Sequence, residues 1–548
     1  MPTSKSLWTR SMTRIFGRSM SSPVPTKGPQ DRRRTRRLVL ETLENRKVFA
    51  ADFDSAFGVG NATGQSEAWD VAVDAAGNSY LTGYFTGTTD FDLAKIHLGN
   101  TDILTARGGN DAFVAKYAPD NSLIWAKRMG GTAADFAAKI AIDGSGNVYV
   151  TGSFTGTGDF GSVNLSSAGL TDGFVTKLNA SGSTLWAKRW GAELTFDQGL
   201  GVAVDATGNV YAASQRSYEL YLNGGIEVFK FTPSGSTVWT KFVNTQSRFG
   251  GGDLAVDAAG SVFVAAKFNG TVDFDPSYSR IRNVSSGASE AAFVLKLTTK
   301  GDFSWVSPIV SLSSSSFVNA NSVALDGGGN LIVGGEYRGS VDFDPSNGTN
   351  SLPTGGVGFI TKLSSTGTLV WAKAVESNRT GAVYGLAVDA LGSIYATGAA
   401  SGTFDLDPGA GMQTRTSVGA GDIFALKLGS DGNFVWGTTI GGTGWDFSRG
   451  IAVDNAGMVY LAGTYRGTVD FNPDPIDAHL LVNPGTFANM FLLKLNQSSS
   501  APLAAASNPG TPTSTELTKN ALGTLDEQMA AWSPEQLESD DTRAKRRR

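Results

Sequence analysis

The stretch Ile-Ala-Ile-Asp-Gly-Ser-Gly-Asn-Val-Tyr-Val-Thr-Gly, residues 140–152, contains the elements that decide the fold. The apolar runs at 140–142 and 148–150 are typical of strands that are buried on both faces. Between them Asp143 is followed three residues later by Gly146, and glycine accepts the positive φ that a tight turn requires. The stretch therefore predicts two buried antiparallel strands joined by a short turn.

This strand–turn–strand unit recurs seven times between residues 71 and 495, at separations of 52 to 69 residues. The aspartates that end its first strand are Asp74, Asp143, Asp205, Asp257, Asp326, Asp389 and Asp454. A third strand of the type Phe174–Leu178 and a fourth strand centred on Trp186 follow in a complete unit. Seven repeats of four antiparallel strands predict an all-β fold, a seven-bladed β-propeller whose short sheets are arranged radially.

A tryptophan marks the fourth strand of six units, and the seventh unit ends without one. These residues are Trp125, Trp186, Trp239, Trp305, Trp371 and Trp436. Near the N-terminus Phe53 precedes Asp74 by 21 residues, the same interval that separates Trp305 from Asp326. We therefore expect an N-terminal strand around Phe53 to complete the last blade, which removes the exposed edges of an open array.

The wording of the repeat resembles a known family. Residues 143–152 and the Phe-Val-Ala-Lys run at 113–116 resemble the SBBP class of bacterial β-propeller repeats, and the strand order resembles NHL-type propellers, over roughly residues 52–496. The resemblance implies a propeller and little about activity. Residues 36–52 resemble an atypical leader of exported bacterial repeat proteins, which implies an extracellular, cell-surface or periplasmic location. The alternative for this segment is a short amphipathic helix or a disordered basic arm.

Composition divides the chain into a basic leader or arm (1–50), the propeller (51–496) and a low-complexity tail (497–548) that we expect to be disordered. Residues 1–50 hold 12 Lys and Arg against 3 Asp and Glu, whereas residues 51–542 carry a net charge of −19. An acidic body lacks the basic face that nucleic acid requires, so we expect no nucleic-acid partner. The absence of cysteine excludes disulfides and thiol catalysis, and no apolar run is long enough to predict a transmembrane segment.

An acidic motif, Asp-Phe-Asp in three units and a variant of it in three more, follows the second strand in six units. Its paired carboxylates belong to Asp90 and Asp92, Asp273 and Asp275, Asp342 and Asp344, and Asp405 and Asp407. Clustered carboxylates are ligands for Ca²⁺, so the motif suggests calcium as a cofactor. In the structural alternative the central Phe packs against the next blade, while the aspartates begin a loop turn.

Residues just ahead of the first strand form a second candidate site, at the mouth of the central channel, where the resembled folds usually carry a ligand. The candidates are Trp69, Asp70, Lys139, Asp253, Tyr384 and Arg449, and Asp135, Asp197 and Asp446 belong to the same region. This mixture of aromatic and charged side chains suits a sugar or another small polar ligand. We expect Trp69 and Tyr384 to provide stacking surface, and Asp70 and Arg449 to provide hydrogen bonds.

These patterns predict an exported binding module without catalysis, whose partner is a surface polymer, a glycan or a protein. The only histidines, His97 and His479, fall in loops, where we expect them on the surface, so a histidine-based triad or metal site has little material. One alternative is a calcium-dependent hydrolase or lactonase, which requires carboxylates and an asparagine that converge on the channel axis. Another is a purely structural envelope protein.

Overall fold

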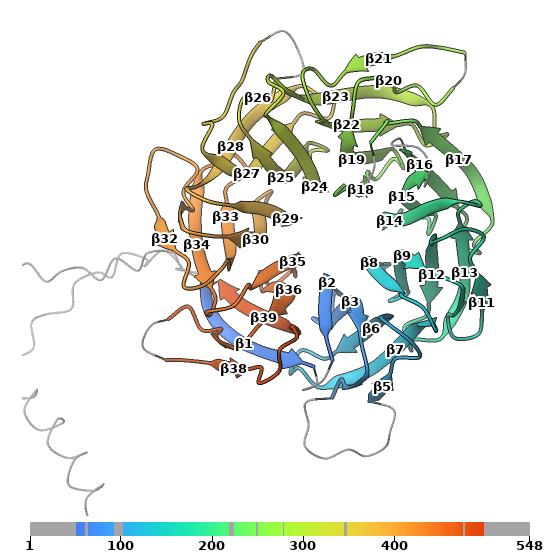
Figure 1. The fold of residues 1–548 in the computed structure, drawn as a ribbon, viewed down its shortest axis with the longest axis vertical. Coiled ribbons are helices and arrows are strands. Elements are labelled where there is room, and N and C mark those ends of the chain that lie inside the picture. The colour runs from blue at the N-terminus through green and yellow to red at the C-terminus, as the bar shows by residue number, and fades with distance from the viewer. Residues whose placement is uncertain are drawn as a thin grey trace, which may run out of the picture. The chain divides into compact units, whose positions relative to one another are not determined.

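Seven sheets surround a central channel in the computed structural model of the chain (Figure 1). The structure describes residues 51–60, 64–92, 102–218, 224–247, 250–277, 279–344, 348–474 and 477–497. The predicted leader, the tail beyond Gln497 and His97 lie outside these ranges. Within them every regular element is a strand, and the search for a helix that could span a membrane finds none. The predicted fold class, a seven-bladed all-β propeller, is confirmed.

Each blade is a four-stranded antiparallel sheet. From the channel outward, blade 1 contains β2 (Ser66–Val73), β3 (Ser79–Phe85), β6 (Asp111–Tyr117) and β7 (Leu123–Gly131). Blade 2 contains β8 (Phe136–Ile142), β9 (Val148–Phe154), β12 (Asp172–Leu178) and β13 (Thr184–Trp190). Blade 3 contains β14 (Thr195–Val204), β15 (Val210–Tyr218), β16 (Gly224–Phe231) and β17 (Thr237–Val243). Blade 4 contains β18 (Asp253–Val256), β19 (Val262–Phe268), β22 (Ala291–Leu297) and β23 (Phe303–Ser311).

The remaining blades follow the same plan. Blade 5 contains β24 (Phe317–Leu325), β25 (Leu331–Arg338), β27 (Gly356–Leu363) and β28 (Leu369–Ser377). Blade 6 contains β29 (Gly381–Val388), β30 (Ile394–Ala400), β33 (Asp422–Leu428) and β34 (Phe434–Ile440). Blade 7 contains β35 (Phe447–Val453), β36 (Val459–Tyr465), β39 (Asn489–Gln497) and β1 (Ala51–Val59).

Short hairpin strands lie between the second and third strands of most blades. They are β4 (Thr88–Asp90) with β5 (Ile103–Thr105), β10 (Thr157–Asp159) with β11 (Asn164–Ser166), β20 (Thr271–Asp273) with β21 (Asn283–Ser285), β26 (Val341–Asp342), β31 (Thr403–Asp405) with β32 (Thr414–Thr416), and β37 (Thr468–Asp470) with β38 (Leu480–Val482). Three of them, β10, β26 and β31, also pair with the outer strand of the preceding blade. They therefore cover edges that a propeller would otherwise expose.

The N-terminal strand closes the ring, as predicted. β1 pairs antiparallel with β39, from Ala51 opposite Gln497 to Val59 opposite Met490 (Figure 1). Phe57 of β1 is buried, and its ring lies 4.9 Å from that of Tyr117 in blade 1. The two ends of the propeller are thereby held in one sheet, and blade 7 has the same number of strands as the others.

The Asp-x-x-Gly signature forms the turn between the first and second strands. In blade 2 the Oδ1 atom of Asp143 accepts hydrogen bonds from the backbone N–H groups of Ser145 and Asn147, and Gly146 has φ of 76°. The hydroxyl of Tyr149 donates to the other carboxylate oxygen at 2.8 Å. The aspartate is required because one side chain satisfies both the turn and the following strand.

The fourth-strand tryptophans join successive blades. Trp186 of blade 2 donates its Nε1–H to the carbonyl of Pro233 in the turn between the third and fourth strands of blade 3, at 3.1 Å. Gly235 of that turn has φ of 83°, and a Cβ atom there would lie 2.8 Å from the Trp186 ring. Trp125, Trp239 and Trp305 make the equivalent bond to the next blade.

The hydrophobic core lies between blades. Its seven clusters each draw side chains from two adjacent blades, so that all seven interfaces are filled. The central Phe of the acidic motif belongs to these layers. Phe91 is fully buried and contacts Phe85 and Phe113 of its own blade at ring distances of 5.6 and 5.1 Å, beside Phe57 of the preceding blade. The expectation that this Phe packs against the next blade is wrong, because Phe91 fills the layer that blade 1 shares with the preceding blade, blade 7.

Candidate functional site

A β-bulge in six of the seven inner strands directs one side chain each toward the channel. In each case the strand register shifts by one residue, for example between Ala68 and Asp70. The residues left without a partner are Trp69, Ala138, Leu200, Asn321, Tyr384 and Arg449. A bulge leaves its extra residue outside the ladder and changes the direction of its side chain.

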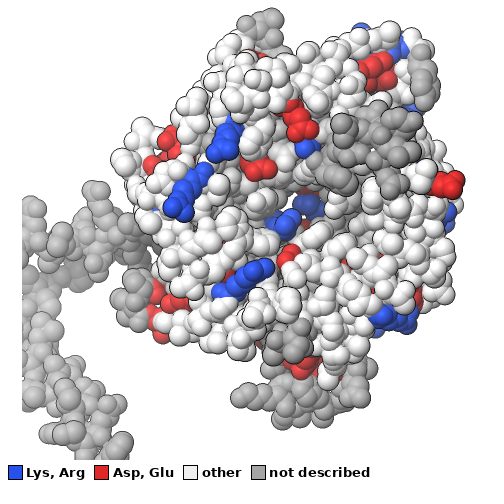
Figure 2. Space-filling view, in the orientation of Figure 1, with Lys and Arg blue, Asp and Glu red and all other residues white. Residues whose placement is uncertain are grey.

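All six bulge residues line one cavity of about 380 Å³, which we call the mouth cavity. Its wall is completed by Gly250, Gly251 and Gly252 ahead of β18, and by the polar side chains of Lys139, Gln198, Asn319 and Glu336. Figure 2 looks down the channel and shows a hollow at the centre of this face, with basic and acidic side chains around it. The repeat therefore builds a single site from nearly every blade.

Aromatic rings in the mouth cavity contact the guanidinium group of Arg449. The guanidinium carbon of Arg449 lies 5.2 Å from the ring centre of Trp69 and 5.7 Å from that of Tyr384. The ring of Phe136, from the blade on the other side of Trp69, stacks on the indole at 5.6 Å with an interplanar angle of 6°. Both faces of Trp69 are thus covered. Our expectation that Trp69 offers a free stacking face is wrong, because the neighbouring blades supply Phe136 and Arg449.

A second cavity of about 190 Å³ lies one residue further along the inner strands, and we call it the floor cavity. It contains Asp70, Lys139 and Asp253, and the Nζ atom of Lys139 lies 3.5 Å from Oδ2 of Asp253. Asp253 also accepts a hydrogen bond from the Ser322 hydroxyl at 3.1 Å. Asp70 accepts one from the backbone N–H of Ile140 at 3.0 Å.

Burial and charge act in opposite directions on the floor groups. Burial raises the pKa of Asp70 to about 6, against the lowering effects of Lys139 and of the Ile140 N–H. Burial disfavours the charged form of Lys139, but the carboxylates of Asp253 and Asp70 outweigh it and raise the pKa of the amine. The positive charge between the two carboxylates is therefore supplied by a lysine of the chain itself.

The six predicted mouth residues, Trp69, Asp70, Lys139, Asp253, Tyr384 and Arg449, thus all line one or both of these adjoining cavities. Glu336, Gln198 and Asn319 were missed. Glu336 lies on β25, a second strand, and a charged residue directly after the buried run 331–335 was the available signal.

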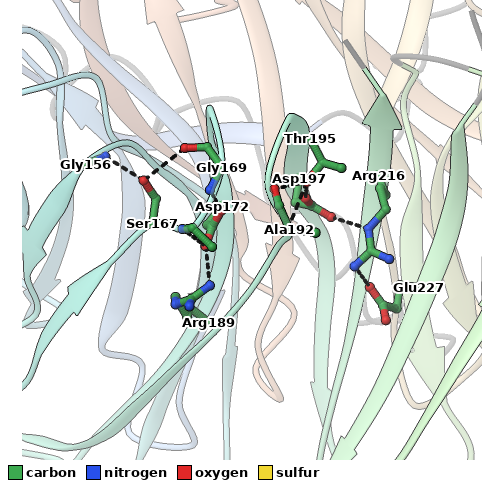
Figure 3. Close-up of polar contacts among 11 residues, drawn as sticks. Gly156, Ser167, Gly169, Asp172, Arg189, Ala192, Thr195, Asp197, Arg216 and Glu227 are labelled. Atoms are coloured by element: carbon green, nitrogen blue, oxygen red, sulfur yellow. Dashed lines mark hydrogen bonds and ion pairs between the residues drawn. The ribbon is translucent and has the colours of Figure 1, made fainter. Parts of the chain in front are cut away.

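Three other aspartates of the same region do not line either cavity. Asp135, Asp197 and Asp446 are buried, and the Asp135 and Asp446 carboxylates accept hydrogen bonds from loop backbone N–H groups such as Gly131 and Gly442. Figure 3 shows the third case, in which Asp197 pairs with Arg216, which in turn pairs with Glu227. Placing these aspartates at the mouth was wrong, because they precede the bulge and point into the blades.

The acidic motif is used for turns. In each of the four pairs the first aspartate accepts the backbone N–H of the second, at 2.9 to 3.1 Å. Asp273, Asp342 and Asp405 also accept an N–H from across the loop. Among the described residues, no group of three or more His, Asp or Glu side chains has the arrangement of a metal site. Calcium binding by these pairs stays a prediction.

A further cavity of about 760 Å³, larger than the mouth cavity, lies away from the channel, beside Phe53, Arg415 and Trp436. Trp436 is the fourth-strand residue that faces blade 7, where β39 and β1 come from opposite ends of the chain and no turn joins them directly. Topology therefore accounts for this cavity. His479 lies nearby, half-buried against Phe53 at a ring distance of 4.8 Å rather than free on the surface.

Comparison with known proteins supports the class. The SBBP β-propeller repeat model matches residues 124–160. The chain is 24% identical over 476 residues to an uncharacterized WD repeat-containing protein of Acanthamoeba polyphaga mimivirus. That alignment covers 70% of this chain and 33% of the relative, so the chain spans about a third of the relative's length. With the seven blades, these matches define a β-propeller repeat protein.

Solved structures give weaker likenesses. A Bacteroides caccae protein of unknown function is 12% identical, with a TM-score of 0.31, over 60% of this chain and 89% of its own. A puromycin hydrolase mutant is 10% identical, with a TM-score of 0.32, over 73% of this chain and 58% of its own. Scores at this level support no inference about ligand or activity.

Proposed function

We propose that this protein is an exported binding module that holds a polar, sugar-like ligand in the mouth cavity and has no catalytic activity of its own. The observation that carries the proposal is the repeated β-bulge, which directs one side chain from each of six blades toward one cavity. Bulges commonly re-aim side chains beside functional sites. A channel that served only to close the ring has no need of such a device.

The chemistry of the lining suits hydroxyl groups. Gln198, Asn319 and Asn321 present amides, which both donate and accept hydrogen bonds, and Glu336 presents a carboxylate acceptor. The volume of about 380 Å³ falls within the usual range for small-molecule sites, roughly 300–1,000 Å³. A sugar unit offers several hydroxyls in a fixed arrangement and therefore matches a wall that is rich in amides.

The hydrolase alternative requires a metal or a free base on the axis. Asp70 and Asp253 are engaged with Lys139 and with backbone or hydroxyl donors. A screen of lactones, esters and glycosides should therefore give no turnover. If the wild type shows metal-dependent turnover and Asp70→Asn abolishes it, the protein is a hydrolase and the binding-module proposal is wrong.

A glycan array tests the proposal. The wild-type protein should retain a subset of glycans, and the double variant Asn319→Ala, Asn321→Ala should lose them because two amides leave the cavity wall. Asn164→Ala is the matched control, since Asn164 is exposed on the hairpin strand β11. Failure of the wild type to retain any glycan, or equal retention by the double variant, would exclude the mouth cavity as a sugar site.

A further inference from the structure

Arg449 is a charged group of the mouth cavity whose guanidinium forms no ion pair with a described residue and has a buried N–H without a hydrogen-bond acceptor. Three rings hold its guanidinium, those of Trp69, Tyr384 and Phe447, with the last at 5.1 Å. Its Nε atom is buried and has no hydrogen-bond partner in the part of the chain that the structure describes. Aromatic faces fix the position of a guanidinium but accept none of its in-plane N–H bonds.

Three arginines of blades 1, 2 and 3 are paired with carboxylates. Arg128 contacts Asp111 at 2.9 Å, Arg189 contacts Asp172 at 2.7 Å, and Arg216 contacts Asp197 at 3.0 Å. Arg449 forms no ion pair of this kind with any described residue. An N–H that is buried without a partner costs free energy, and an incoming acceptor recovers that cost.

The remaining charges of the two cavities already have partners. Glu336 accepts a hydrogen bond from the Asn319 amide at 3.2 Å. Lys139 pairs with Asp253, and Asp70 accepts the Ile140 N–H. Arg449 is therefore the group whose strongest interaction has still to be made, and a planar guanidinium matches a carboxylate or a sulfate through two parallel hydrogen bonds.

We propose that the ligand of the mouth cavity is an anionic sugar, a unit of an acidic polysaccharide whose carboxylate or sulfate binds Arg449 while its hydroxyls contact the amides of Gln198, Asn319 and Asn321. The inference rests on the proposed function, since it names the class of ligand for the same site. Trp69 is a positioning residue, because it holds the guanidinium and leaves no face for the sugar.

Calorimetric titration with three probes of equal length tests the inference: a galacturonate trisaccharide, the same trisaccharide with its carboxylates reduced to hydroxymethyl groups, and a sulfated galactose trisaccharide. The galacturonate or the sulfated probe should bind the wild type at least tenfold more tightly than the reduced probe. Whichever of the two is preferred identifies the anion. The preference should weaken with added salt.

Variants then assign the preference to one side chain. Arg449→Gln should remove the difference between charged and reduced probes, and Arg449→Lys should keep part of it, because an amine has charge without the planar fork. Arg282→Gln is the matched control, since Arg282 is exposed and stacks on Phe303 far from the channel, and it should behave as the wild type.

Two results overturn the inference and are distinguishable. If the wild type binds charged and reduced probes with equal affinity, the sugar site is retained but the inference that the ligand is anionic is wrong. No binding of any probe, together with an empty glycan array, removes the proposed function and the inference together. The wild-type comparison needs no variant, so a misfolded Arg449 variant leaves the test intact.

Discussion

The pKa of Asp70 is raised by the position of this residue in the floor cavity. Asp70 occupies the floor cavity, where burial disfavours its charge and Lys139 favours it, and burial prevails. Its folded-state pKa of about 6 exceeds the value of 3.8 that it has when exposed. The protonated form is therefore favoured in the folded protein. The stability that Asp70 contributes is present below about pH 4 and is lost as the pH rises through about 6.

We predict that Asp70→Asn becomes progressively more stable relative to the wild type between about pH 4 and pH 7. The asparagine keeps an oxygen that can accept the Ile140 N–H but carries no charge. Denaturant unfolding of both proteins across this range measures the difference. Asp135, whose pKa is also raised to about 6, is present in both proteins and cancels. A difference that stays constant or reverses with pH contradicts the assignment.

At the scale of the strand, the β-bulge decides which side chains reach the ligand site. In a regular strand successive side chains lie on opposite faces, so the sequence predicts which residues share a face. A bulge inserts one extra residue, and beyond it each side chain lies on the face opposite to the one predicted. Trp69 and Arg449 were found from their position at the start of the repeat, where the channel mouth was expected. Asp197 and Asp446 were misplaced because nothing in their sequence reveals the bulge. The turns, in contrast, could be predicted, because the residues within a turn specify it. Asp143 and Gly146, for example, identify the turn between β8 and β9.

The joint between blades is also an element-scale feature. Trp186→Phe should lower the free energy of unfolding by about 1 kcal/mol through the lost hydrogen bond to Pro233. Trp186→Ala should cost about 3–5 kcal/mol because it also opens a cavity. Trp445, which is 41% exposed, is the control, and Trp445→Ala should cost no more than about 0.5 kcal/mol. If Trp186→Ala and Trp445→Ala lower the free energy of unfolding equally, Trp186 does not stabilise the contact between blades 2 and 3.

The calcium hypothesis belongs to the hairpin elements. If Asp342 and Asp344 bind Ca²⁺, millimolar calcium should raise the Tm by mass action, and the double substitution to Asn should reduce that rise. The hydrogen bond from the Asp344 N–H to Asp342 at 2.9 Å is compatible with asparagine, so the turn should survive. If neither calcium nor a chelator changes the Tm, the calcium hypothesis is wrong and the acidic motif serves to form the turn.

At the scale of the whole molecule, the ring depends on a strand from the far end of the chain. The seven-fold repeat predicted this closure because Phe53 holds the place of the missing tryptophan. The asymmetry of the joint was not predictable. β39 and β1 lack the turn that covers the tryptophan in other blades, and the cavity of about 760 Å³ lies at that position.

A chain that begins at Gly60 should lose several kcal/mol of stability, because removing β1 exposes the edge of β39 and apolar surface worth about 25 cal/mol per Å². Deleting residues 1–50 keeps β1 and should leave the Tm unchanged, which makes it the matched control. Thermal melting of the two truncated proteins provides the comparison. Equal melting temperatures would show that the ring closes without β1.

We propose that the ligand binds in the mouth cavity rather than in the larger cavity at blade 7. Calorimetric titration of the sugar retained on the array tests it, with Asn319→Ala, Asn321→Ala against Arg415→Gln, since Arg415 lines the larger cavity. We predict at least a tenfold loss of affinity for the mouth variant and wild-type affinity for Arg415→Gln. Wild-type affinity in the mouth variant, with a loss in Arg415→Gln, would place the site at blade 7 and contradict the account.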